Sequence, residues 1–159
     1  MEVPIPNFYF MGVQFVHLLA LSLWVGGLVV TATITAPVLF SVLPSRALAG
    51  QVFSEIHKKL ERLLLASSAA LVMTGVIKYR TWENLTPWNF GRYIAIGIMS
   101  VSILYSFTGL SPRLRALQVE GAGAALSSER EAEFKRLHRL SYRCMWINLI
   151  GGLVVLLLA

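Results

Sequence analysis

His17 is the residue whose type and position most favour chemistry. It lies about 10 residues into an apolar helical segment, or roughly 15 Å along the helix axis, within a stretch from Val3 to Ser45 that contains no charged residue. An ionisable side chain at such a depth in a membrane is a functional candidate by default. Gln14 and Trp24 lie three residues before and seven residues after His17, near one helical face, so we expect Gln14 to orient the imidazole.

Two methionines are candidates to join His17 in a metal or haem site. Met73 is five residues from Lys78 and Met99 is six residues from Tyr93, which places both sulfurs at a depth similar to that of His17. Imidazole and thioether together suit Cu(I) or the axial positions of haem. A site for haem b or copper would therefore comprise His17, Gln14, Trp24, Met73 and Met99. The alternative is a neutral His17 hydrogen-bonded inside a helix bundle, with the methionines as ordinary packing residues.

The other two histidines lie at a different depth in the membrane. His57 and His138 each lie about one turn before an apolar run, at the end of the helices opposite to His17. A zinc site formed by these histidines and Cys144 is one interpretation. In the other interpretation, the two histidines belong to a basic cluster at the membrane interface, which pairs with Glu55 and Glu61 or with lipid phosphates.

Motifs for catalysis are absent from the sequence. It has no Gly-rich phosphate loop, no Ser/His/Asp set, no paired acids and no HExxH motif, which favours a non-enzymatic protein. The sequence also lacks Asp, and we expect no Glu inside a membrane span, which disfavours a proton-coupled carrier.

Four apolar runs must position these residues. We predict membrane spans at about 8–42, 60–79, 88–110 and 142–159, joined by polar segments at 43–59 and 111–141. With 159 residues, 56% of them hydrophobic, the chain has room for one membrane domain. The first segment lacks the basic start of a secretory signal, so we expect its helix to be retained. Four spans favour an all-α, up-down-up-down four-helix bundle with both termini on one side.

Local signals predict where the helices start. Ser45 is expected to cap the second helix, and Thr86 to cap the third, with Pro87 at its first position. Ser128 and Glu131 match a capping box for the fourth helix.

Two further signals predict breaks in the helices. Pro37 follows a Thr-rich segment and is expected to kink the first helix, with Thr hydroxyls satisfying the carbonyls that it frees. The Gly- and Ala-rich stretch 121–125 is predicted to be a flexible loop.

Basic residues predict the orientation of the bundle. Of the 14 Lys and Arg residues, 11 lie on one side, which the positive-inside rule places in the cytoplasm, with both termini outside. The net charge of +6 is thereby assigned to membrane contact and not to nucleic acid. The side chains expected to contact anionic lipid headgroups are Lys58, Lys59, Arg62, Arg136, Arg139 and Arg143.

The sequence also resembles a known family. The segment HLLALSLWVGG at 17–27, the segment at 36–40 and the late segment at 137–141 carry the likeness. They resemble a bacterial four-helix membrane family of unknown function that is grouped with vertebrate transmembrane protein two-hundred-and-five. The first segment is also similar to copper-resistance protein D, whose membrane domain is associated with copper uptake. This resemblance implies a four-helix membrane protein with His17, Trp24, Gly26, Gly27 and Pro37 as motif positions.

These observations lead to three functional hypotheses. The first is a non-enzymatic, multi-pass protein of a bacterial inner membrane that packs against other subunits, or against copies of itself, as an accessory component. The second is a membrane protein that holds haem b or copper at His17. The third is a transporter of small solutes or lipids that acts as an oligomer.

Overall fold

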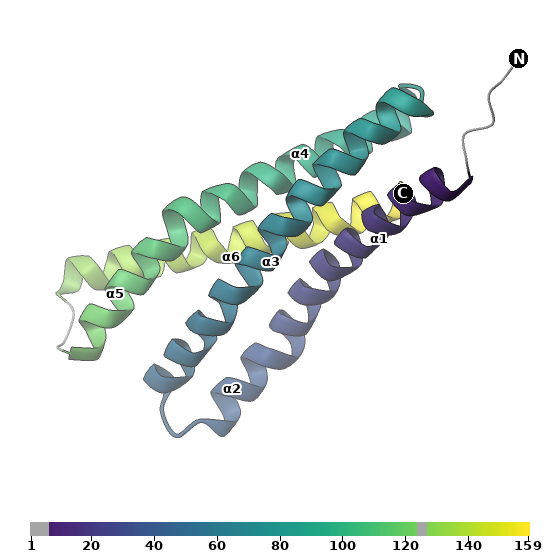
Figure 1. The fold of residues 1–159 in the computed structure, drawn as a ribbon. Helices are drawn as coiled ribbons and strands as arrows, with labels where there is room; N and C mark the ends of the chain where they lie inside the picture. The colour runs from purple at the N-terminus through teal and green to yellow at the C-terminus, as the bar shows by residue number, and fades with distance from the viewer. Residues whose placement is uncertain (1–6, 124–126) are drawn as a thin grey trace, which may run out of the picture.

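The computed structural model describes residues 7–123 and 127–159, and it has helices and no strand within these ranges (Figure 1). The predicted all-α fold is confirmed. Four helical segments are each long and apolar enough to cross a membrane, which makes the chain a multi-pass membrane protein. The first segment comprises α1 (Asn7–Val30), the π-helical turn η1 (Thr31–Thr35) and α2 (Ala36–Val42). The other three are α3 (Arg46–Thr81), then α4 (Pro87–Tyr105) with η2 (Ser106–Leu110) and α5 (Ser111–Gly123), and finally α6 (Ser128–Leu157).

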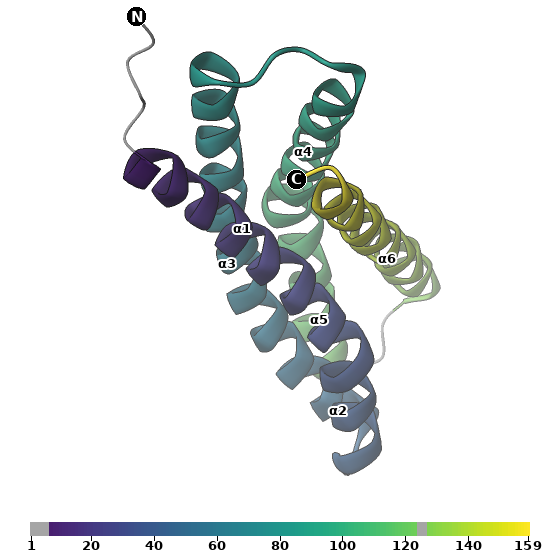
Figure 2. The same cartoon turned by 90° about the vertical axis from the view of Figure 1, so that its right-hand side faces the viewer.

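The four segments pack as a ring. α1 contacts α3 and α6, α3 contacts α4, and α4 contacts α6, as the two views show (Figures 1 and 2). α1 begins and α6 ends at the same end of the bundle, beside the loop 82–86. We call this the terminal end, and we call the opposite end, which carries most of the Lys and Arg residues, the basic end.

Glycines set the closest approaches between neighbouring helices. At four glycines, an added Cβ would lie 2.7–3.4 Å from a side-chain atom of the adjacent helix. Small residues allow such contact because van der Waals packing, rather than a hydrophobic effect, holds helices together in lipid. The pairs are Gly27 of α1 with Leu60 of α3, Gly75 of α3 with Tyr93 of α4, Gly151 of α6 with Met99 of α4, and Gly152 of α6 with Val25 of α1.

Two spans contain a proline in their interior, and a π-helical turn precedes each of these two prolines. η1 ends two residues before Pro37 and η2 ends two residues before Pro112. In each case the Thr four residues before the proline donates its hydroxyl hydrogen to the carbonyl one turn earlier, at 2.7 Å for Thr33 and 2.8 Å for Thr108. Each proline lacks the N–H that would bond to the preceding turn, and yet the helix continues through both prolines after a π turn. The break expected at Pro37 is thus a π turn, and Pro112 leads into α5.

Two of the three predicted helix starts are confirmed. The Ser45 side chain accepts a hydrogen bond from the N–H of Leu48, and the Thr86 side chain accepts one from the N–H of Asn89. Each bond satisfies one of the N–H groups that a helix start leaves without a carbonyl partner.

The predicted capping box at the fourth helix is wrong. Ser127, and not Ser128, is the N-cap of α6, and its side chain makes no capping bond. The Glu131 carboxylate pairs instead with Lys135, one turn further along the helix, at 2.6 Å. The predicted loop at 121–125 also differs, because α5 continues to Gly123. Residues 124–126 lie outside the described residues.

Replacement of Gly152 by Val should lower the free energy of unfolding by about 1–3 kcal/mol, because it overpacks the contact between α6 and α1. Gly97 is the matched control, since nothing lies within 4 Å of an added Cβ on its exposed side of α4. Gly97→Val should change the stability by less than about 0.5 kcal/mol. Unfolding in mild detergent measures both. An equal loss in the two variants would contradict the assigned α1–α6 contact.

Candidate functional site

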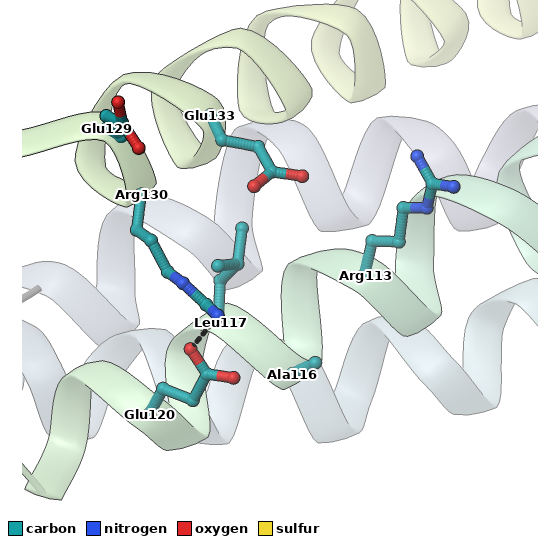
Figure 3. Close-up of a pocket in the computed structure, with 7 residues that line it drawn as sticks. All are labelled: Arg113, Ala116, Leu117, Glu120, Glu129, Arg130 and Glu133. Atoms are coloured by element: carbon teal, nitrogen blue, oxygen red, sulfur yellow. Dashed lines mark hydrogen bonds and ion pairs between the residues drawn. The ribbon is translucent and has the colours of Figure 1, made fainter. Parts of the chain in front are cut away.

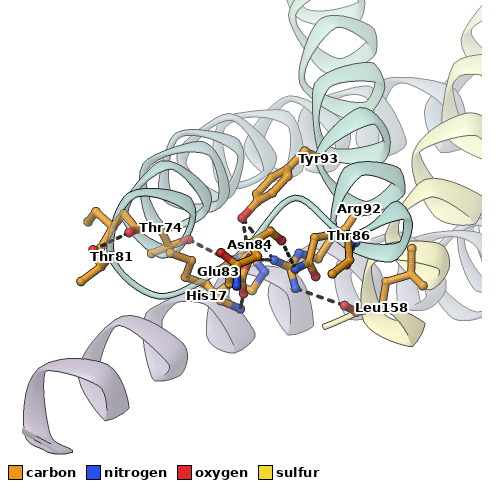
Figure 4. Close-up of polar contacts among 12 residues, drawn as sticks. His17, Thr74, Thr81, Glu83, Asn84, Thr86, Arg92, Tyr93 and Leu158 are labelled. Carbon is orange, nitrogen blue, oxygen red and sulfur yellow. Dashed lines mark hydrogen bonds and ion pairs between the residues drawn. The ribbon is translucent and has the colours of Figure 1, made fainter. Parts of the chain in front are cut away.

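His17 lies fully buried at the terminal end, and its hydrogen-bond partner fixes its tautomer (Figure 4). Its Nδ1 lies 2.8 Å from Oγ1 of Thr74. The single Thr74 hydroxyl hydrogen points to the backbone carbonyls of Ala70, at 2.7 Å, and Leu71, at 3.2 Å. Thr74 therefore accepts from His17, and Nδ1 carries the proton. The Nε2 lone pair is buried and has no hydrogen-bond partner within the described residues.

The other residues of the predicted cofactor site are only partly brought together. Thr74, and not Gln14, orients the imidazole, and Gln14 is half-buried. Met73 is 59% exposed, because one helical residue turns the side chain by about 100° from the inward-facing Thr74. The expectation that the Met73 sulfur faces His17 is therefore wrong.

Trp24 and Met99 do lie inside the bundle. Both are fully buried, and they meet beside Gly152 of α6. A Cβ at Gly152 would lie 3.5 Å from Trp24 Cδ1 and 3.7 Å from Met99 Cε. Trp24 therefore shares the inward face of α1 with His17, as predicted, while Met99 packs where α1, α4 and α6 meet.

A group of charged side chains occupies the terminal end next to His17. The loop cluster consists of Lys78, Glu83, Arg92 and Tyr93. Figure 4 labels Glu83, Arg92 and Tyr93. Glu83 accepts from the Tyr93 hydroxyl at 2.5 Å, pairs with Lys78 at 3.2 Å and forms an ion pair with Arg92. Arg92 also donates to the carbonyl oxygen of Leu158, after the end of α6, at 3.1 Å. One carboxylate thus ties α3, the loop 82–86 and α4 together, and Arg92 adds α6.

The loop cluster buries Lys78. A lysine at the end of a membrane span commonly keeps its ammonium group at the membrane surface, but this residue is only 3% exposed. Its side chain turns inward because Glu83 supplies a partner there. Burial raises the pKa of Glu83, but the hydrogen bonds from Tyr93 and Lys78 and the positive charges of Lys78 and Arg92 outweigh this effect. The net result is a lowered pKa, so Glu83 is ionised at neutral pH.

A second buried charge lies at the basic end. Glu61 of α3 is fully buried, although we expected no Glu inside a span. Its Oε1 accepts from the hydroxyl of Ser106 at 2.9 Å and from the hydroxyl of Ser111. Ser106 is the first residue of the π turn η2, and Ser111 is the residue that follows it. Nε2 of His57 lies 3.7 Å from Oε1, and Nη1 of Arg115 lies 3.8 Å from Oε2. We call these five residues the Glu61 cluster.

Between the two ends, hydroxyl and amide groups join helices across the ring. Ser68 of α3 donates to Ser100 of α4 at 2.8 Å, and Asn148 of α6 donates to Ser102 of α4 at 2.9 Å. Sequence reasoning missed these bonds. The available signal was the helical spacing of polar residues along α3, at His57, Glu61, Ser68, Thr74 and Lys78, all of which turn inward.

The predicted zinc site is wrong. His57 belongs to the Glu61 cluster, His138 is exposed and stacks on Phe134 with ring centroids 6.1 Å apart, and Cys144 is buried. Among the described residues, no three His, Cys, Asp or Glu side chains are close enough to hold a metal ion.

The predicted headgroup residues are placed at the surface of the basic end. Lys58 is half-buried and lies 3.9 Å from Glu55. The other five are exposed. Contact of these six residues with anionic lipid stays a prediction.

A pocket of about 350 Å³ opens between α5 and α6 at the basic end (Figure 3). Its charged lining residues are Arg113, Glu120, Glu129, Arg130 and Glu133, and Arg130 pairs with Glu120 across the pocket. Among the described residues, the lining contains no His, Ser, Thr, Cys or Lys.

Replacement of Glu83 by Gln should destabilise the protein by about 3 kcal/mol, because it leaves the buried cations Lys78 and Arg92 without a counter-charge. Glu120→Gln is the control: Glu120 also pairs with an Arg, but both side chains are about half exposed, and the expected loss is below about 1 kcal/mol. Unfolding in detergent at neutral pH measures the difference. Similar losses in the two variants would contradict a structural role for the loop cluster.

The same carboxylate predicts a pH dependence of stability. Because the pKa of Glu83 is lowered on folding, its contribution is complete above the unfolded value of about 4.3 and is lost as the pH falls through the lower folded value. The stability of the unsubstituted chain should therefore decline below about pH 4.3 more steeply than that of the Glu83→Gln variant. Parallel acid profiles would show that Glu83 is not held ionised.

Comparison with known proteins gives a family and no activity. The model of a domain of unknown function, DUF4149, matches residues 19–123. The match includes Trp24, Glu61 and Arg92, but it begins after His17 and ends before α6. No curated protein and no solved structure matches. The likeness to transmembrane protein two-hundred-and-five and to copper-resistance protein D therefore stays a prediction, whereas the matched segment shows that the chain belongs to the DUF4149 family.

Proposed function

We propose that this protein is a non-enzymatic accessory subunit that associates, inside the membrane, with another membrane-spanning helix through the outward face of α1. The observation that carries the proposal is the small, exposed pair Ser22 and Gly26. Nothing lies within 4 Å of a Cβ added at Gly26, so this small-residue pair is left unused by the chain's own packing.

The Ser22 hydroxyl is a second indication that this face of α1 contacts another helix. Ser22 is exposed near the middle of its span, and it makes no hydrogen bond to any described residue. Other exposed hydroxyls, such as those of Thr33, Ser41 and Thr108, donate to backbone carbonyls of their own helices. An unpaired hydroxyl in hydrocarbon is costly, and a neighbouring helix supplies its partner. Small residues four apart allow that helix to approach closely.

A photo-crosslinking residue at Ser22, introduced in native membranes, should give a discrete adduct with a membrane protein. Gly26→Ile should reduce this adduct at least about tenfold, because about 1.4 kcal/mol of lost packing suffices for that factor. Gly97→Ile is the control, since Gly97 is also exposed but has Tyr93 and Val101 four residues away and no small partner. An adduct of twice the chain's mass identifies a second copy. Adducts with lipid alone would contradict the proposal.

A second candidate function follows from the unpaired Nε2 of His17. A histidine that ligates a metal commonly donates its other N–H to a fixed acceptor, and Thr74 is that acceptor here. Trp24 Nε1, on the same face of α1, also lacks a partner within the described residues. Lys78 and Arg92 act on His17 as positive charges and Glu83 as one negative charge. The net positive charge disfavours a bare copper ion and favours a ligand with carboxylates, such as haem.

An absorption spectrum of the protein from its native membrane, taken in mild detergent with metal analysis, tests this second candidate. A haem site predicts a Soret band that is lost in His17→Ala. Thr74→Val should weaken it, because the imidazole loses its fixed orientation. His138→Ala, at an exposed histidine, is the control and should retain the band. A colourless, metal-free preparation would remove the candidate.

A further inference from the structure

The pocket between α5 and α6 is not used by the proposed association, and some of its lining charges have no partner. Arg130 and Glu120 pair with each other across it. The side chains of the other three charged residues make no ion pair or hydrogen bond with any described residue; they are Arg113 of α5 and Glu129 and Glu133 of α6. Charges beside the pocket do pair, as Glu131 does with Lys135. Two carboxylates and one guanidinium of the pocket thus lack a counter-charge among the described residues.

These unpaired charges are separated by sign. Both carboxylates belong to α6, where residues four apart share a helical face and like charges repel each other. The guanidinium belongs to α5. Figure 3 shows Arg113 at one end of the pocket, Glu129 at the other end and Glu133 between them. A ligand that compensates these charges must therefore present a cation to α6 and an anion to Arg113.

The depth of the pocket selects the kind of ligand. Arg113 lies three residues after the predicted span 88–110, or about 5 Å along the helix axis, which is the depth of lipid headgroups. Glu133 lies nine residues before the predicted span 142–159, or about 14 Å, and so farther from the hydrocarbon. The anion is thus expected at headgroup depth and the cation farther out. An ethanolamine phospholipid has this order, because its phosphate follows the glycerol and its ammonium group comes last.

We propose that this pocket binds the headgroup of an ethanolamine phospholipid, with the phosphate on Arg113 and the ammonium group on Glu133. A guanidinium suits the phosphate because its N–H groups reach two phosphate oxygens at once. The ammonium group donates hydrogen bonds to the Glu133 carboxylate, and Glu129 adds negative charge at the outer end. The volume of about 350 Å³ is at the lower end of ligand sites, which suits a headgroup and leaves the acyl chains in the bilayer.

The charges of the pocket also discriminate between headgroups. A choline headgroup carries three methyl groups on its nitrogen and has no N–H to donate to Glu133. A glycerol headgroup has a phosphate but no cation, and the two carboxylates repel its negative charge. The pocket therefore differs from the exposed basic residues of the same end, which are expected to contact anionic lipids of any kind.

The experiment counts the lipids bound to the full chain by native mass spectrometry, in detergent with equal amounts of ethanolamine and choline phospholipids that have the same acyl chains. The unsubstituted chain should bind the ethanolamine lipid about fivefold better, the factor that one favourable exposed ion pair supplies. Glu133→Gln should remove this preference, and Arg113→Gln should lower binding of the ethanolamine lipid by a similar factor. Glu131→Gln removes a carboxylate of the same helix outside the pocket, and as the control it should retain the preference. All three substituted residues are exposed, so we expect the variants to fold.

Equal binding of the two lipids by the unsubstituted chain would overturn the proposal, and so would a preference that persists in Glu133→Gln. Soluble phosphoethanolamine carries the same charged groups and tests whether the ligand is a lipid. An excess of it should leave the ethanolamine lipid bound, because only the lipid adds contacts of its acyl chains with the apolar helices. Displacement of the lipid by phosphoethanolamine would assign the pocket to a soluble ligand and overturn the lipid assignment.

Discussion

Hydrocarbon offers no hydrogen bonds, and this constraint explains why charged and hydroxyl side chains of the described spans turn inward and pair with one another. The clearest case is Glu83, which lies between Lys78 and Arg92 at the terminal end. Sequence position alone would leave both cations at the membrane surface. They turn inward because both pair with the Glu83 carboxylate, and Arg92 also donates to the Tyr93 hydroxyl. A buried ion pair need not add stability, but removal of either partner leaves the other charge buried without a counter-charge.

The same constraint explains why the spans stay helical through their prolines. Each proline removes an N–H, and a π turn that contains a Thr hydroxyl bonded to the carbonyl one turn back precedes each of them. The pattern Thr-x-x-x-Pro occurs at Thr33 and Pro37 and again at Thr108 and Pro112. Each pattern lies in the first segment of a helical hairpin. The two hairpins, α1 to α3 and α4 to α6, therefore share one arrangement of Thr, π turn and Pro, and glycines lie at the contacts that join the helices into a ring.

The sequence predicts the helices better than the contacts between them. Uncharged runs and the caps at Ser45 and Thr86 locate the spans, because these signals are local. The partners of His17 and Glu61 lie 45–57 residues away along the chain, at Thr74, Ser106 and Ser111. Periodicity tells which face a residue occupies, but not which residue of another helix it meets. For this reason Gln14 and Met73 were expected near His17, and Glu61 was assigned to a surface cluster.

Six buried side-chain polar atoms have no hydrogen-bond partner among the described residues. Two of them, Nε2 of His17 and Oε2 of Glu61, lie at opposite ends of the bundle. Their neighbouring atoms, Nδ1 and Oε1, are held by hydroxyls that leave the second atom free. Buried polar atoms without partners are rare in folded proteins.

Oxygen accessibility of spin labels along α3, in lipid bilayers, tests the central claim that the polar face of this helix points into the bundle. The account predicts a helical period: labels at 63, 66, 69, 73 and 76 are accessible to oxygen dissolved in lipid, and labels at 61, 64, 68, 71, 74 and 78 are protected. Protection at the first set and access at the second would place Glu61, Thr74 and Lys78 toward lipid. That result would contradict the internal pairing on which the structure depends.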